Sequence, residues 1–218
     1  LRARDGAWSS PRNVFTFVKG SATAEIVGRA GRFVFAIARG NLRAAIYDPT
    51  VEEWSQGWGP SFASTDAVAV VIPRVAINRD GYAYVSAAGG TNTAPPVLGF
   101  DYGGTKTWQE FSSLAQGETY TTFDSGCTAA GVVIDDTGYA GYIQACSRKS
   151  GDAASANRVW VKRLEGASTK APIYTAPAAA VNQAHRDSYR LLRSSDGTVH
   201  SFRWDDTNKQ VLYRSSKN

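Results

Sequence analysis

One pattern recurs four times along the sequence: an apolar strand, a turn with a glycine, and a second strand rich in aromatic residues. The copies read AEIVGRAGRFVFAIA, RVAINRDGYAYVSA, AGVVIDDTGYAGYIQA and YRLLRSSDGTVHSFRW. Their turn glycines are 50, 57 and 59 residues apart and stand at Gly31, Gly81, Gly138 and Gly197. A second hairpin-like stretch follows each copy, which makes four strands per unit. Four-stranded units repeated at this period predict an all-β chain folded as a β-propeller.

Two apolar runs indicate that the sheets stack face to face. The segments 32–39 (RFVFAIAR) and 67–77 (AVAVVIPRVAI) are apolar at successive positions rather than at every second one. A strand with one solvated face alternates apolar and polar residues, so these two strands are expected to be covered on both faces. Helical periodicity is nearly absent from the sequence.

The two ends of the chain continue one repeat. The N-terminal LRARDGAW resembles the phase of the repeat that LYRSSKN has reached at the C-terminus. The stretch after Gly197 has 21 residues and the stretch up to Gly31 has 31, and their total of 52 matches the internal spacing. We therefore predict a single domain over residues 1–218, with four blades of four antiparallel strands, in which residues 1–17 supply the strand that completes the last blade. A slice of a larger propeller is the alternative.

The two cysteines fit the third repeat. In the hairpin VVIDDTGYAGYI, a turn between Asp136 and Thr137 sets Cys127 opposite Cys146 on the adjacent strand. Residues opposite each other in an antiparallel pair have Cα atoms about 5 Å apart, within reach of a disulfide. We predict a Cys127–Cys146 disulfide, and two buried thiols are the alternative.

The charge and the histidine content narrow the classes of partner. The net charge of +5 comes from scattered lysines and arginines, without an RNA-binding aromatic pattern, a helix-turn-helix or a zinc-finger spacing. The sequence therefore predicts no nucleic-acid partner and a mildly basic solvated surface, which an anionic polysaccharide or a sialylated surface would also suit. With two histidines and no metal-ligand spacing, no metal or cofactor is expected. No apolar run is long enough to span a membrane.

The first residues of the chain bear on whether the protein is secreted. The first residue is Leu1, and no Met occurs in the sequence. The chain is therefore either a processed mature protein or an excised piece, and we expect a secreted protein whose leader has been removed. A disulfide is typical of that compartment.

The C-terminal segment HRDSYRLLRSSDGTVHSFRWDDTNKQVLYRSSKN, residues 185–218, resembles a known family. Its Asp-Gly hairpin followed by LYRSS is similar to the BNR-type repeat propellers, which include sialidases, polysaccharide lyases and non-catalytic lectin-like proteins. In SSDGTV, Gly197 directly follows Asp196, so the Ser-x-Asp-x-Gly-x-Thr-Trp spacing of the sialidase Asp-box is not reproduced. The resemblance implies a propeller fold and a glycan as ligand or substrate.

Within this segment, the resemblance to polysaccharide lyases implies three kinds of catalytic residue. β-Elimination needs a proton-transfer pair and a cation, because the α-proton becomes acidic only when the carboxylate charge of the uronate is offset. The candidates are His185 and His200 for proton transfer, Tyr189 and Tyr213 as the partner acid or base, and Arg186 and Arg193 for the carboxylate. A structural histidine between blades is the alternative for His200. A sialidase ranks below a lyase, because no glutamate lies near Tyr213 to support a tyrosine nucleophile.

Aromatic residues recur at one phase of the units. Each follows a polar turn, and the set consists of Trp8, Trp54, Trp108 and, in the third unit, Tyr174. Such rings either pack between blades or stack on sugar rings. Repetition favours binding over catalysis, because several weak sites add avidity. We therefore expect a secreted, non-catalytic, lectin-like propeller that binds a glycan. A glycan-active enzyme of BNR type is the alternative, and an adhesin module is a third.

Overall fold

The protein, described by a computed structural model, is all-β in the part of the chain that the structure describes. That part comprises residues 13–14, 23–38, 41–61, 72–88, 96–112, 120–122, 131–149, 158–166, 168–177, 189–205 and 208–216. Within these ranges no helix is long and apolar enough to cross a membrane.

The strands form four antiparallel sheets, numbered 1 to 4 in chain order. Sheet 1 consists of β1 (Thr23–Arg29), β2 (Arg32–Ala38), β3 (Asn41–Asp48) and β4 (Glu53–Ser61). Sheet 2 consists of β5 (Ile72–Ile77), β6 (Ala83–Ala88), β7 (Pro96–Phe100) and β8 (Trp108–Ser112). Sheet 3 consists of β10 (Gly131–Ile134), β11 (Ala140–Lys149), β12 (Arg158–Glu165) and β13 (Ser168–Pro177), with β9 (Tyr120–Thr122) paired to the end of β11. Sheet 4 consists of β14 (Tyr189–Arg193), β15 (Val199–Asp205) and β16 (Gln210–Ser216).

The predicted repeat is confirmed at its turns. The four turn glycines have φ angles of +78°, +95°, +72° and +86° in chain order, a region that glycine enters without the clash of a Cβ. The residue two positions after each glycine pairs with the end of the third strand. These pairs are Phe33 with Tyr47, Ala83 with Phe100, Ala140 with Glu165, and Val199 with Ser216. The four sheets therefore share one register.

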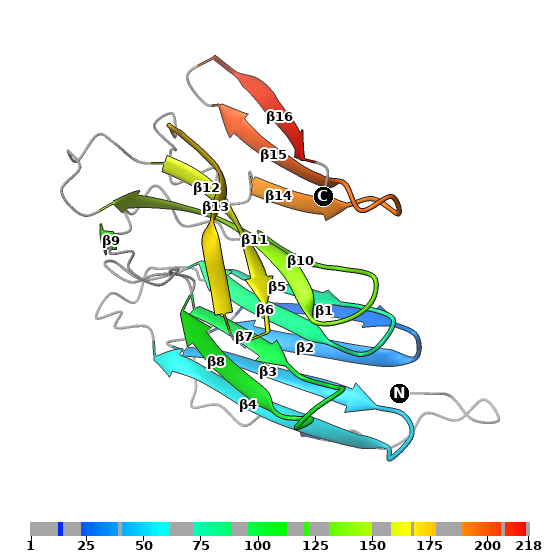
Figure 1. Ribbon diagram of the computed structural model, residues 1–218. Coiled ribbons are helices and arrows are strands. Elements are labelled where there is room, and N and C mark those ends of the chain that lie inside the picture. Colours follow the sequence, from blue (N-terminus) through cyan, green and yellow to red (C-terminus); the bar gives the residue numbers. More distant parts are fainter. Residues whose placement is uncertain are drawn as a thin grey trace.

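The four sheets lie beside one another in chain order, each with a face toward the next (Figure 1). Their first strands contact one another in sequence, β1 with β5, β5 with β10, and β10 with β14. The fourth strands β4, β8 and β13 contact one another in the same order. Successive propeller blades pack in this way. Sheet 4 has three strands among the described residues, and these do not show a closed ring, so the number of blades stays a prediction.

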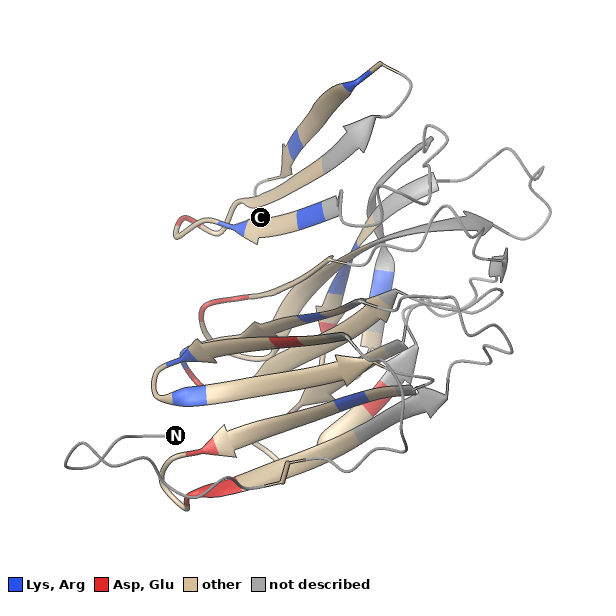
Figure 2. Cartoon of the chain, turned by 180° about the vertical axis from the view of Figure 1, so that it is seen from behind, with Lys and Arg blue, Asp and Glu red and all other residues tan. Residues whose placement is uncertain are grey.

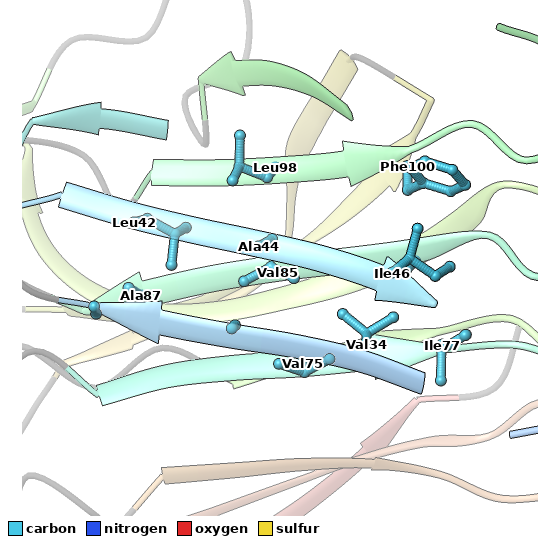
Figure 3. Packing of buried hydrophobic residues seen from close by; sticks show 13 residues of the cluster. Val34, Leu42, Ala44, Ile46, Val75, Ile77, Val85, Ala87, Leu98 and Phe100 are labelled. Atoms are coloured by element: carbon cyan, nitrogen blue, oxygen red, sulfur yellow. The ribbon is translucent and has the colours of Figure 1, made fainter. Parts of the chain in front are cut away.

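Apolar side chains fill the spaces between successive sheets. Between sheets 1 and 2, Val34 and Ile46 lie among residues of β5, β6 and β7 such as Val75, Val85 and Phe100 (Figure 3). A second cluster around Tyr84 joins sheets 2 and 3, and a third around Leu191 joins sheets 3 and 4. Burying such side chains stabilises the stack by roughly 1.5–3 kcal/mol each.

The expectation that both apolar runs are covered on both faces holds for one of them. In β5, which lies between sheets 1 and 3, the neighbouring residues Val75, Ala76 and Ile77 are all buried. In β2 the burial alternates, and Phe33 is 39% exposed. For β2 the expectation is wrong, because sheet 1 lies at the end of the described stack and has a neighbouring sheet on one face only.

The predicted register of the third hairpin is off by two residues. Gly131 pairs with Gln144 and Ile134 with Gly141, so the turn is centred between Thr137 and Gly138. The positive φ of Gly138 places that residue inside the turn, which explains the shift. Cys146 pairs with Val159 on its other side, and Cys127 lies outside the described residues, so the Cys127–Cys146 disulfide stays a prediction.

Polar contacts join the hairpin turns of different sheets. Asp136, in the turn of sheet 3, forms ion pairs with Arg29 of sheet 1 and with Arg79 of sheet 2, the latter at 3.2 Å. The buried side chain of Asn78 donates from Nδ2 to the carbonyl of Gly138 at 2.6 Å. These contacts bring the turn ends of three sheets together on one side of the molecule.

Candidate functional site

A glutamate lies at the seam between the first strands of sheets 1 and 2. Glu25 pairs across β1 and β2 with the buried Ala36, so its side chain is on the face of sheet 1 that packs against sheet 2. Its Oε2 accepts a hydrogen bond of 2.8 Å from the backbone N–H of Val75 on β5. The first strand of a sheet has an unpaired edge, and Glu25 satisfies one N–H on that edge. A carboxyl group is thereby held in place where the sheets converge.

The surroundings of Glu25 favour its protonated form. Burial raises the pKa of this carboxyl above its ordinary value, and this effect outweighs the Arg74 charge, the hydrogen bond from Val75 and the Arg190 charge, all of which lower it. Arg74 is on β5, and Arg190 is on β14 of sheet 4. Two cations from two other sheets thus act on a carboxyl that retains its proton to higher pH than a solvated glutamate. Proton donors in enzyme sites are tuned in this way.

Replacing Glu25 by Gln is expected to raise the free energy of unfolding above that of the parent at pH 7, and to raise it less at pH 4. The carboxyl of the folded protein has a raised pKa, so its contribution to stability is complete below the unfolded-state pKa and is lost as pH rises through the folded-state pKa. Glutamine removes this loss and still offers an oxygen to Val75. Because Glu25 is partly exposed, the gain is expected to be at most about 1 kcal/mol. Urea unfolding of both proteins at pH 4 and pH 7 measures it.

Glu165→Gln is the matched control, with the opposite sign. A hydrogen bond from Lys170 lowers the pKa of Glu165, so the stability that this carboxylate contributes is present at pH 7 and is lost on acidification. The Glu165→Gln variant should therefore be less stable than the parent at pH 7. A Glu25→Gln variant that loses stability at pH 7 in the same way would contradict the assignment.

The structure brings two of the predicted lyase residues together. His200 Nδ1 lies 2.9 Å from the hydroxyl of Tyr213, and its Nε2 lies 3.1 Å from Oγ of Ser194. The rings of His200 and Tyr213 are stacked, with centroids 5.9 Å apart. Ser194 in turn contacts Asp196, whose carboxylate also accepts from the backbone N–H and the hydroxyl of Thr198 at 3.0 Å. Both imidazole nitrogens therefore have partners within sheet 4.

The other predicted lyase residues are not joined to this pair. Arg193 lies on the opposite face of sheet 4 from His200 and forms a largely buried ion pair of 2.9 Å with Asp135 of sheet 3. Its guanidinium is therefore engaged between two sheets. The backbone of Tyr189 pairs with Arg203, but its side chain is not described. His185 and Arg186 lie outside the described residues.

Two of the predicted stacking aromatics have defined surroundings. Trp108 packs against the cluster between sheets 1 and 2 and donates from Nε1 to the carbonyl of Ser55 on β4 at 3.0 Å. Its ring occupies the space left by Gly57, where a Cβ would approach to 2.3 Å. Trp54 is half-buried, and its ring lies 5.4 Å from that of Tyr47. The geometry of Trp108 is that of a contact between sheets. Trp8 and the side chain of Tyr174 lie outside the described residues, so the sugar-stacking role of all four residues stays a prediction.

Glu25, Arg74 and Arg190 are not among the site residues predicted from the sequence. The sequence feature that could have identified them is a charged residue inside a mostly apolar strand, as Glu25 is in TAEIVGR and Arg74 is in IPRVAI. Their convergence depends on the packing of sheets that are distant in sequence. Figure 2 shows the described acidic and basic residues spread over many strands of the sheets, as the sequence suggested.

Comparisons with known proteins give distant structural similarity and no sequence match. No protein-family model matches the chain, and no curated protein matches it significantly. The arabinanase Arb43A of Bacillus subtilis is similar over 88% of this chain and 72% of its own, with 12% identity and a TM-score of 0.42. The NanB sialidase from Streptococcus pneumoniae is similar over 89% of this chain, with 13% identity and a TM-score of 0.45, but the chain covers only 30% of it. For the polysaccharide lyase Uly1 the shares are 86% and 56%, with 11% identity and a TM-score of 0.27.

Proposed function

We propose that the protein is a glycan-active enzyme that cleaves a polymer containing an acidic sugar. One observation carries the proposal: the carboxyl of Glu25 is half-buried between sheets 1 and 2, held at 2.8 Å by the backbone N–H of Val75, and the charges of Arg74 and Arg190 act on it. These residues come from the first strands of three different sheets. Binding sites are places where a few polar groups converge within a largely apolar surround, and these three residues form such a group. The BNR-like C-terminal segment agrees with a glycan as substrate.

Each residue has a role that follows from its charge. Arg74 and Arg190 offer guanidinium groups, which bind carboxylates in planar, two-point contacts. A sugar carboxylate placed on them brings the neighbouring glycosidic bond to Glu25. Protonated Glu25 then donates its proton to the leaving glycosidic oxygen as the glycosidic bond breaks. The sugar takes a hydroxyl from water in hydrolysis, or gives up the proton beside its carboxylate to solvent in elimination. The basic net charge of +5 favours the approach of an anionic polymer.

The test is a depolymerisation assay with matched acidic and neutral glycans. Polyuronates and sialylated glycans form the acidic set, and arabinan and unmodified glucans form the neutral set. New reducing ends are expected from at least one acidic glycan, and ultraviolet absorbance of an unsaturated uronate distinguishes elimination from hydrolysis. Cleavage of neutral glycans alone would contradict the role of the two arginines. Absence of cleavage from every glycan would contradict the enzymatic proposal.

The lectin-like function expected from the sequence is the second candidate. The half-buried Trp54 and its neighbour Tyr47 form an aromatic pair on the outer face of sheet 1, of the kind that stacks on sugar rings. Calorimetry with the same glycans separates the two functions, because a lectin binds without forming new reducing ends. This second proposal also includes three features expected from the sequence: secretion, a Cys127–Cys146 disulfide and a four-bladed ring.

A further inference from the structure

A buried glutamine lies in the seam between sheets 3 and 4. Gln144 of β11 pairs with Gly131 on one side and with Val161 on the other, and Val161 belongs to the cluster that joins these two sheets. The side chain of Gln144 therefore points into this seam, which is lined by apolar side chains such as Leu191 and Val199. Gln144 is fully buried. A carboxamide in such surroundings has lost its hydrogen bonds to bulk water.

The carboxamide of Gln144 has no protein partner in the described part of the chain. Its Oε1 and its Nε2 are both buried there without a hydrogen-bond partner. A carboxamide has two donor hydrogens and an acceptor oxygen, so several hydrogen bonds are missing at one place. Buried polar groups in folded proteins are nearly always satisfied, either by protein or by an ordered water. The buried amide therefore indicates that a small polar molecule binds beside it.

A backbone N–H of sheet 4 faces the same place. In the hairpin of sheet 4, the N–H of Ser194 donates to the carbonyl of Thr198 at 3.0 Å. Because the N–H groups of an antiparallel pair point toward the partner strand at every second residue, the N–H of Leu191 points away from β15. It faces β10 of sheet 3, since a Cβ on Gly131 would lie 3.2 Å from the nitrogen of Leu191. The N–H of Leu191 and the side chain of Gln144 thus both lie beside Gly131.

The seam between sheets 1 and 2 shows how the equivalent N–H is satisfied there. Val75 is the equivalent of Leu191, because it stands three residues before Asn78, whose N–H closes the hairpin of sheet 2 in the same way. The N–H of Val75 donates to Oε2 of Glu25 on the first strand of the preceding sheet, at 2.8 Å. Between sheets 3 and 4, the nearby residue on the preceding first strand is Gly131, which has no side chain to accept such a bond. The acceptor for Leu191 therefore has to be another group.

We propose that the seam between sheets 3 and 4 contains a binding site for one internal water molecule. The water accepts a hydrogen bond from the N–H of Leu191 and is hydrogen-bonded to the carboxamide of Gln144. Ser201 is buried and lies opposite Leu191 on the same face of sheet 4, so its hydroxyl offers a third partner. An internal water makes about three hydrogen bonds to groups that would otherwise be unsatisfied, and this set supplies them. The water thus has the part that the carboxyl of Glu25 has between sheets 1 and 2.

The direction of a stability change tests the water site. Gln144→Met keeps an unbranched side chain of similar length but removes both polar atoms of the carboxamide. With a bound water, this substitution leaves the N–H of Leu191 unsatisfied, so the urea midpoint is expected to fall at an unchanged m-value. If the carboxamide is instead unpaired, removing it relieves a desolvation cost and the midpoint rises. Leu164→Met, in the apolar cluster between sheets 2 and 3, is the matched control for fitting a methionine into a packed seam.

The midpoint of Gln144→Met is expected to fall further than that of Leu164→Met, and a smaller fall or a rise would overturn the proposal. A crystal structure of the unsubstituted protein gives an independent readout if a variant does not fold. Density for one water is expected within hydrogen-bond distance of both the Leu191 nitrogen and the Gln144 carboxamide. Absence of such density, or a direct hydrogen bond from Gln144 to a protein group, would contradict the water site. Neither experiment measures cleavage of a glycan, so this proposal and the enzymatic one fail separately.

Discussion

Glu25→Gln is expected to lower the turnover of an acidic glycan by about 10²–10⁴-fold, with a small change in KM. Glutamine has nearly the same shape and still accepts the hydrogen bond from Val75, but it has no proton to donate to a leaving oxygen. The loss should therefore appear in kcat. Initial rates measured on the best substrate of the depolymerisation assay, with far-ultraviolet circular dichroism to confirm folding, provide the test.

Two further variants separate this role from a structural one. Glu53→Gln changes an exposed carboxylate on β4 and should leave kcat and KM unchanged. Arg190→Ala should raise KM more than it lowers kcat, because its guanidinium is assigned to substrate binding. A Glu25→Gln variant that retains turnover within about twofold of the parent would rule out proton donation by this residue.

Tyr84→Ala is expected to cost about 3–5 kcal/mol of unfolding free energy. Tyr84 is fully buried between sheets 2 and 3, and its ring is stacked on that of Tyr139, with centroids 5.1 Å apart. Its hydroxyl donates to the carbonyls of Tyr139 and Gly166, at 2.8 and 3.3 Å. Removing the ring leaves a cavity at the centre of the second cluster and takes a donor from the carbonyl of Gly166, whereas the carbonyl of Tyr139 still accepts from the backbone N–H of Gly166. Urea unfolding at constant m-value measures the loss.

Tyr84→Phe is the matched control, because it keeps the ring and removes only the hydroxyl. The expected cost is about 1–2 kcal/mol, the range for leaving a buried hydrogen-bond partner unsatisfied. The difference between the two variants reports the packing of the ring between the sheets. Equal losses in both variants would show that the hydroxyl, rather than the packing between sheets 2 and 3, accounts for the effect.

The repeat could be predicted from the sequence because it depends on interactions between residues that are close in the chain. A hairpin turn needs a residue with positive φ, and glycine marks that position in all four units. Apolar strands on either side of each turn then predict antiparallel pairing, and the shared register of the four sheets follows from the common distance between turn and strand. The same local logic missed the register of the third hairpin by two residues, since the spacing alone does not show that Gly138 lies inside its turn.

The candidate site was not readable, because its residues meet only through packing between sheets. Glu25 and Arg190 are far apart in the chain, and neither stands in a recognisable motif. Glu25 and Arg190 are each a polar residue within a strand, flanked by apolar or aromatic neighbours. Only the convergence of β1, β5 and β14 places the two arginine charges near one desolvated carboxyl, and desolvation is a property of the packed state. The sequence thus determined the strands, the turns and the four-fold repeat, which depend on neighbouring residues. The tertiary structure decided the faces that are covered, the partners of His200 and the surroundings of Glu25, which depend on contacts between distant ones.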